Sequence, residues 1–394
     1  MNLWLFDLDG VLIHPGGYRE ALRRTVAHFS RRMGNPERPL EESEIEAFEA
    51  QGITCEWDIA GICAAADAFA IWRANPDLHL PADLFRAMIV LQKGALKRPE
   101  PEYAGWARRT GALGGESPSL SAAKIFRQEA GHTEADIDRV GEFDSVLDAL
   151  LGHPREFARS PVMQYFQQFT LGSRTYADLY RVPADVETPS LLAELDRPAF
   201  SAANRDRILT MHRERKIRSA IITARPCRPR GAADDPTEFP PEAEIALKVI
   251  GLEELPLVGA GQMLWLSKRH GQQPDAYLKP NPAHSLAAIS MALGTAEGDG
   301  LEAGRALVEE GQLLPPLDAL KKETADIVVF EDSPTGVLAT QSAVDLLNRK
   351  GMNIRMSFLG VAAGGEKRTA LEALGAEILD STDEALAYAW KKVG

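Results

Sequence analysis

The stretch Leu3-Trp4-Leu5-Phe6-Asp7-Leu8-Asp9-Gly10-Val11-Leu12 decides the fold, because a short apolar run ends in two acids and a glycine. Such a run predicts a buried strand whose carboxyl end carries an anionic corner. Mg²⁺ prefers carboxylate and carbonyl oxygens and keeps positions open for a substrate phosphate. Asp-Gly between apolar segments is also a strong hairpin signal, so this stretch alone leaves a metal corner and a simple turn equally open.

Polar groups recur at three later places in the chain. Ala220-Ile221-Ile222 runs into Thr223-Ala224-Arg225-Pro226, a lysine stands in Tyr277-Leu278-Lys279-Pro280, and Ile327 to Phe330 runs into Glu331-Asp332-Ser333-Pro334. Each place has an ordinary alternative: Thr223 as a helix cap, Lys279 as a surface lysine, and Ser333-Pro334 as a helix start. Capping by Ser333 is compatible with metal binding by Asp332.

In this order, the four segments resemble the four motifs of the haloacid dehalogenase-like (HAD) hydrolase superfamily. The matching residues are Asp7 and Asp9, then Thr223, then Lys279, then Glu331 with Asp332. The arrangement is most similar to the subgroup with a helical cap inserted after the first motif, which includes small-molecule phosphatases and β-phosphoglucomutase. Glu56-Trp57-Asp58 and Leu171-Gly172-Ser173 also look like segments of that subgroup.

The expected fold is α/β: a doubly wound parallel sheet forming a Rossmann-like HAD core, with an inserted, mainly helical cap domain. Asp7 and Thr223 lie too far apart in the chain for an uninterrupted core. We therefore expect the catalytic core at 1–13 and 204–394 and the helical cap at 14–203.

Periodicity places the core elements. We expect strands at Ile217 to Thr223, Met263 to Ser267, from Ile327 onward, and Ile354 to Val361, with helices at Asn204 to Arg215, Glu242 to Ile250, Ala283 to Leu293, Gly300 to Glu310 and Pro334 to Lys350. Two connections, 226–241 and 294–320, exceed the usual loop length. A tolerated surface insertion is the ordinary interpretation of each.

The motif residues suit phosphoryl transfer. Asp7 is the expected nucleophile, because a carboxylate can take up a phosphoryl group and divide one hard step into two. Mg²⁺ is the expected cofactor, held by Asp7, Asp332 and Glu331, and the resemblance adds the main-chain carbonyl of Asp9. The Asp9 side chain is then free for general acid and base catalysis. The Thr223 hydroxyl and nearby backbone N–H groups, at Ala224, would bind phosphoryl oxygens, and Lys279 would balance charge.

Arginines are the better guesses for further substrate contacts. Arg19 and Arg225 can hold a second phosphate or a carboxylate at two points, and Trp57 with Asp58 would belong to the cap face over the site. The expected function is Mg²⁺-dependent hydrolysis of a small phosphomonoester through an aspartyl-phosphate. A phosphomutase with the same chemistry and a noncatalytic HAD-fold binding protein remain alternatives.

The amino-acid composition limits the classes of binding partner that we expect. The formal net charge is −13, from 44 basic and 57 acidic residues in a chain of 394, which disfavours nonspecific binding to nucleic acid or to an anionic membrane. The three cysteines show no metal-type spacing, and the first apolar run stops at Asp7, so we expect a cytoplasmic protein without a signal peptide. The expected partner is a small phosphorylated metabolite, and the oligomeric state is left open.

Overall fold

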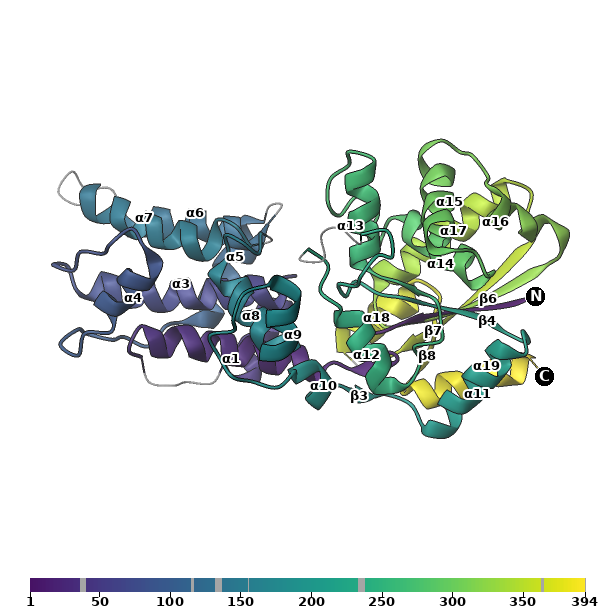
Figure 1. Ribbon diagram of the computed structural model, residues 1–394, viewed down its shortest axis with the longest axis horizontal. Helices are drawn as coiled ribbons and strands as arrows, with labels where there is room; N and C mark the ends of the chain where they lie inside the picture. Colours follow the sequence, from purple (N-terminus) through teal and green to yellow (C-terminus); the bar gives the residue numbers. More distant parts are fainter. Residues whose placement is uncertain are drawn as a thin grey trace. The chain divides into compact units, whose positions relative to one another are not determined.

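A single parallel sheet organises the core of the protein (Figure 1). The computed structural model describes residues 1–35, 40–114, 117–131, 137–154, 156–232, 238–362 and 365–393. The six strands run in the order β5-β4-β1-β6-β7-β8, and every neighbouring pair is parallel. Their bounds are β1 (Asn2–Asp7), β4 (Arg218–Ile222), β5 (Leu257–Val258), β6 (Ala325–Glu331), β7 (Ile354–Val361) and β8 (Glu377–Leu379). The predicted α/β fold with a doubly wound sheet is confirmed.

Side chains of the central strand β1 alternate between two apolar layers. Leu3 and Leu5 pack with buried residues of the helices α13 (Ala260–Arg269), α14 (Pro282–Ala292) and α17 (Pro334–Arg349). Trp4 and Phe6 pack with residues of α11 (Ala202–Arg213), α12 (Glu242–Ile250) and α19 (Thr382–Val393) on the other face. The sheet is therefore covered by helices on both faces. Ligands of such sheets bind beyond the carboxyl ends of the strands, where the chain order reverses, here at β1.

A helical insert follows β1. Clustering of contacts divides the chain into a core unit, Met1–Gly16 with Leu195–Gly394, and a helical insert, Gly17–Glu194. The insert contains the helices α1 (Gly16–Arg32), α2 (Glu42–Glu49), α3 (Glu56–Ala74), α4 (Leu84–Leu91), α5 (Tyr103–Leu113), α6 (Pro118–Ala130), α7 (Ile137–Leu151), α8 (Pro161–Leu171), α9 (Ser173–Tyr180) and α10 (Leu191–Leu195). Throughout the described chain, no helix has both the length and the apolar character needed to cross a membrane.

The insert is shorter at both ends than the predicted 14–203. The short strands β2 (Ile13–His14) and β3 (Arg197–Pro198) pair antiparallel and belong to the core unit. Two residues per strand produce no readable alternation, so the sequence pattern did not reveal this pair.

Two predicted segments of the core differ from the structure. The predicted strand Met263 to Ser267 lies inside α13, where the buried side chains of Met263 and Leu266 share one helix face, and β5 takes the strand position before it. In the connection 294–320, the predicted helix Gly300 to Glu310 is present as α15 (Glu297–Glu309), and α16 (Pro315–Asp318) with a 3₁₀ turn at Ala319–Lys322 makes the rest more helical than expected. Of the other long connection, 226–241, residues 233–237 lie outside the described chain. A short helix α18 (Gly365–Ala373) precedes β8.

Candidate active site

The first motif is an acid at a strand end followed by a tight turn. Asp7 is the last residue of β1 and is paired in register with Ile222 of β4. The backbone then turns, with the N–H of Gly10 donating to the carbonyl of Ile13 at 2.9 Å. Gly10 has φ +77°, and a Cβ there would lie 2.3 Å from a carboxylate oxygen of Asp332. Both the turn and the acidic corner foreseen from the sequence are therefore present, and glycine is needed for each.

Lys279 lies between two carboxylates. Its Nζ donates to Asp7 Oδ1 at 2.7 Å and to Glu331 Oε2 at 2.8 Å, and its side chain is 9% exposed. Burial lowers the pKa of Lys279, but the two carboxylates outweigh it and raise that pKa above the ordinary value. Lys279 is thus a buried permanent cation at the meeting point of β1 and β6, and the surface-lysine alternative is wrong.

Asp7, Glu331 and Asp332 form a cluster of acids. One ligand atom from each lies within 4.8 Å of the others. Burial and the neighbouring Glu331 raise the pKa of Asp7 well above its usual range, Asp332 raises it further, and Lys279 lowers it only in part. Burial likewise raises the pKa of Asp332, although Lys367 opposes this. Asp7 and Glu331 therefore share one buried lysine, while Asp332 pairs with the exposed Lys367. A divalent cation would relieve the mutual repulsion of the three acids.

The oxygens of this cluster are not equally available. Glu331 Oε2 accepts from Lys279, and Oε1 accepts from the Ser333 hydroxyl at 2.7 Å. Asp332 Oδ2 accepts from the exposed Lys367 at 2.7 Å. Within the described chain, Asp7 Oδ2 and Asp332 Oδ1 accept no hydrogen bond. The donor set fits a small hard cation, and these two oxygens are the ones open to it. Ser333 also caps α17 through the N–H of Gly336.

Thr223 lies directly beyond β4, next to Asp7 in the sheet. Its N–H donates to the carbonyl of Val258 at 3.0 Å, and its Oγ1 accepts from the N–H of Arg225 at 3.0 Å. The hydroxyl hydrogen remains to be donated. The Val258 carbonyl also faces Nε2 of His284 at 3.1 Å. Burial and then Lys279 lower the pKa of His284 to about 3, so its ring is neutral and Nε2 can donate. Ala224, the next residue, is exposed.

Asp9 is engaged by Arg225. Nε of Arg225 donates to both carboxylate oxygens of Asp9, at 2.9 and 2.8 Å, and its Nη1 donates to Asp196 Oδ2 at 2.8 Å. The side chains of Arg225 and Asp196 are 1% and 0% exposed, whereas that of Asp9 is 34% exposed. Arg225 therefore lacks the exposed face that the predicted substrate contact requires. Asp9 can act as proton donor or acceptor only if this ion pair opens.

Asp196 is the site residue that the sequence did not indicate. It stands as a single acid between Leu195 and Arg197, just before β3, and no motif surrounds it. A fully buried acid beside an arginine is visible only once the chain has folded.

The remaining predicted contacts lie in the helical insert. Arg19 of α1 pairs there with Glu42 and with Glu49, at 2.9 Å for the latter. Asp58 of α3 is 1% exposed and accepts from Ser119, and Trp57 packs edge-on against Phe166. These contacts stabilise the insert itself. A role of Arg19, Trp57 or Asp58 in substrate binding stays a prediction.

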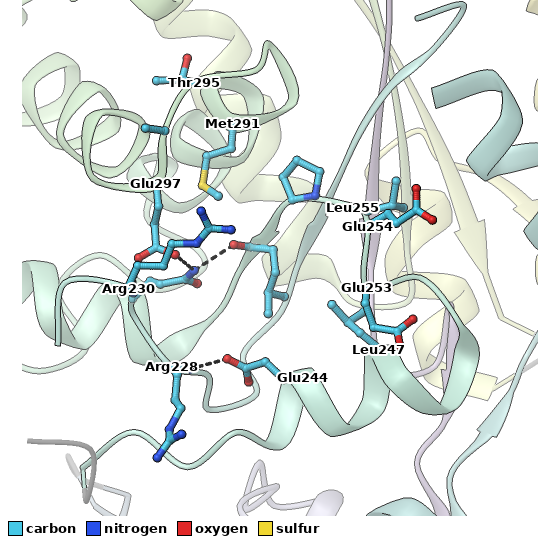
Figure 2. A pocket seen from close by; sticks show the side chains of 14 residues that line it. Arg228, Arg230, Glu244, Leu247, Glu253, Glu254, Leu255, Met291, Thr295 and Glu297 are labelled. Atoms are coloured by element: carbon cyan, nitrogen blue, oxygen red, sulfur yellow. Dashed lines mark hydrogen bonds between the residues drawn. The ribbon is translucent and has the colours of Figure 1, made fainter. Parts of the chain in front are cut away.

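A cavity of the core unit contains none of the motif residues. It has a volume of about 340 Å³ and lies beside β5, where Arg228, Arg230, Glu244, Glu297, Leu255 and Met291 line it (Figure 2). Gln262 bridges Glu297 and the carbonyl of Leu257 across its wall. Its charges are mixed, and no carboxylate cluster of the kind at Asp7 lies there within the described chain. The open carboxylate oxygens of the described chain's acid cluster lie at Asp7 and Asp332 and not in this cavity.

Comparison with known proteins bears on the fold. No family model matches the chain, and a search of curated proteins found no match either. Among solved structures, an X-ray structure from the Northeast Structural Genomics Consortium aligns with a TM-score of 0.64 at 14% identity, covering 100% of this chain and 99% of the other. The chain therefore shares that fold from end to end.

Two further solved structures align with lower scores. They are the phosphatase Tt82 from Thermococcus thioreducens, at a TM-score of 0.40 and 16% identity, and a hydrolase from Pseudomonas syringae, at 0.34 and 13%. The alignments cover 99% of both chains in the first case and 100% of both in the second. Scores of this size carry no argument about activity. The sheet order and the helical insert after β1 match the architecture expected from the sequence.

Proposed function

We propose that this protein is a HAD-like phosphatase that hydrolyses a small phosphomonoester with the help of Mg²⁺. The observation that carries the proposal is the cluster of Asp7, Lys279, Glu331 and Asp332 at the carboxyl ends of β1 and β6. A buried lysine between acids can neutralise the negative charge that develops on the phosphoryl oxygens during phosphoryl transfer.

Asp7 is the proposed nucleophile. Its Oδ2 accepts no hydrogen bond within the described chain, while Oδ1 is held by Lys279. Attack of Oδ1 on phosphorus, with Oδ2 left for the metal, forms an aspartyl-phosphate as the ester P–O bond breaks, and the leaving alkoxide takes a proton from Asp9 once the ion pair between Asp9 and Arg225 has opened. Water then attacks the same phosphorus and gives its proton to Asp9, which releases inorganic phosphate and restores Asp7. The Thr223 hydroxyl and Lys279 would donate to the phosphoryl oxygens in both steps.

Asp7 and Asp332 would hold Mg²⁺ through their open oxygens, together with the main-chain carbonyl of Asp9. When bound, the ion supplies charge neutralisation and polarises the phosphoryl group. Glu331 lies in the same cluster, but both of its oxygens already accept hydrogen bonds, from Lys279 and Ser333. Its part in the proposal is to orient Lys279.

The proposal is tested by phosphate release. p-Nitrophenyl phosphate and a panel of sugar, acid and nucleoside phosphates are incubated with the protein in Mg²⁺ or in EDTA, comparing wild type with Asp7→Asn. Asp326→Asn is the matched control, because Asp326 lies near the opposite end of β6, where its side chain forms an ion pair with Arg355. We expect metal-dependent release that Asp7→Asn abolishes and Asp326→Asn retains. Substantial release by Asp7→Asn would refute the nucleophile, and transfer to a second substrate hydroxyl instead of water would identify a mutase.

A further inference from the structure

The proposed catalytic lysine lies on a loop without regular structure. Residues 270–281 connect α13 to α14, and Lys279 is near the end of this connection. Short-range backbone bonds shape the loop: the N–H of Leu278 donates to Asp275, and the N–H of Asn281 donates to Leu278 at 2.8 Å. The Asn281 side chain also donates to the carbonyl of Ala276 and caps α14. These bonds define a local shape but do not tie the loop to the rest of the core.

Helix α15 connects this loop to the rest of the core. This helix lies against α14 so closely that a Cβ at Gly304 would meet the carbonyl oxygen of Ala283 at 2.6 Å. Two glutamates of α15 then bind three side chains of the lysine loop. His270 Nε2 lies 3.0 Å from Glu302 Oε2, Gln272 Nε2 donates to Glu309 Oε1 at 3.2 Å, and the Tyr277 hydroxyl donates to the same oxygen at 2.5 Å.

Arg305 holds the two glutamates in place. Its Nε donates to Glu302 Oε1 at 2.9 Å and its Nη1 to Glu309 Oε2 at 2.8 Å, and its side chain is 8% exposed. A third acid of the same region, Glu310, lies 2.7 Å from Nη2. A buried guanidinium with several acceptors fixes the direction of each carboxylate better than an exposed ion pair would.

We propose that Arg305, Glu309 and Tyr277 form an anchor that positions Lys279. The Tyr277 side chain is 2% exposed and is separated from Lys279 by one residue. Fixing its ring and hydroxyl restricts the path of the backbone that sends Lys279 Nζ to Asp7 and Glu331. The helical connection 294–320 thus has a role beyond that of a surface insertion. The inference rests on the proposed function only in that Lys279 is taken as the group that acts on the phosphoryl oxygens.

The decisive variant is Tyr277→Phe, which removes the anchoring hydroxyl and keeps the buried ring. Tyr388→Phe is the matched control, because Tyr388 lies on α19 and contacts Lys392 rather than the loop. Hydrogen exchange is followed by mass spectrometry in peptides covering 270–281, and kcat and KM are measured on the best phosphomonoester. We expect faster exchange confined to this loop, a kcat about tenfold lower and an unchanged KM, because a misplaced catalytic group costs rate rather than binding.

Arg305→Gln provides a second variant, with a larger effect expected in the same peptides. Exchange in the loop equal to that of wild type and Tyr388→Phe would overturn the anchor. So would a fall in kcat accompanied by faster exchange over the whole core, since that pattern describes a general loss of stability. If wild type itself releases no phosphate, the proposed function fails, while the exchange of residues 270–281 still decides whether the anchor exists.

Discussion

Replacing Lys279 by methionine should expose the charge balance of the site. Methionine keeps the length and apolar stem of the side chain but removes the cation that lies 2.7 Å from Asp7 and 2.8 Å from Glu331. At an effective dielectric constant of about 20, each of these pairs contributes an attraction of about 6 kcal/mol before desolvation is counted. Desolvation cancels much of this attraction, and breaking a buried pair typically costs about 3–5 kcal/mol of unfolding free energy.

The assay is urea denaturation followed by circular dichroism, in EDTA and in Mg²⁺. Lys279→Met should lose about 3–5 kcal/mol in EDTA, whereas Lys321→Met, which removes an exposed pair with Asp318, should lose under about 1 kcal/mol. Because Asp7 and Glu331 are then left without the buried lysine, Mg²⁺ should restore more stability to Lys279→Met than it adds to wild type. Phosphate release should still be lost.

Two results of the denaturation assay would contradict this prediction. If Lys279→Met is as stable as Lys321→Met in EDTA, the acids of the cluster do not depend on Lys279. If Mg²⁺ stabilises the variant no more than wild type, the ion does not bind among these acids. Either outcome would remove the electrostatic basis of the proposed site.

Three further predictions concern other groups. Arg225→Met should destabilise the protein by about 3–5 kcal/mol because Asp196 loses its buried cation. Adding Asp196→Asn should recover most of that lost stability. Equal melting midpoints for the single and double variants would contradict the ion pair. Asp9→Asn should slow hydrolysis of alkyl phosphates more than that of p-nitrophenyl phosphate, because a good leaving group needs no proton; equal slowing would exclude the general acid. In the insert, burial and the nearby Arg32 and Arg31 lower the pKa of His28 from 6.5 to about 4. Between pH 6.5 and pH 4, only the unfolded state protonates the His28 ring, so the free energy of unfolding should fall by about 3 kcal/mol as the pH drops across this range. In acid denaturation curves, His28→Phe should lack this part of the pH dependence.

Much of the core was predictable because the sequence patterns that mark its strands and helices are local. Strands β1, β4 and β6 are short apolar runs that lead into polar residues, and α12 and β7 occupy the predicted ranges. The strand predicted at Met263 to Ser267 was wrong because a short apolar run fits a buried helix as well as a buried strand. In the insert, glycine and polar residues interrupt the apolar spacing of α5 and α9, so apolar periodicity alone does not indicate these two helices.

By itself, the sequence determined the α/β class, the presence of a helical insert and the residues that reach the carboxyl edge of the sheet. Strand periodicity and the polar groups at strand ends are properties of neighbouring residues, so they can be seen before folding. Tertiary structure alone decided how those groups pair. Lys279 lies between Asp7 and Glu331, and Arg225 joins Asp9 to Asp196. Such contacts depend on distances across the folded chain, because a buried charge takes whichever partner the packing brings within reach.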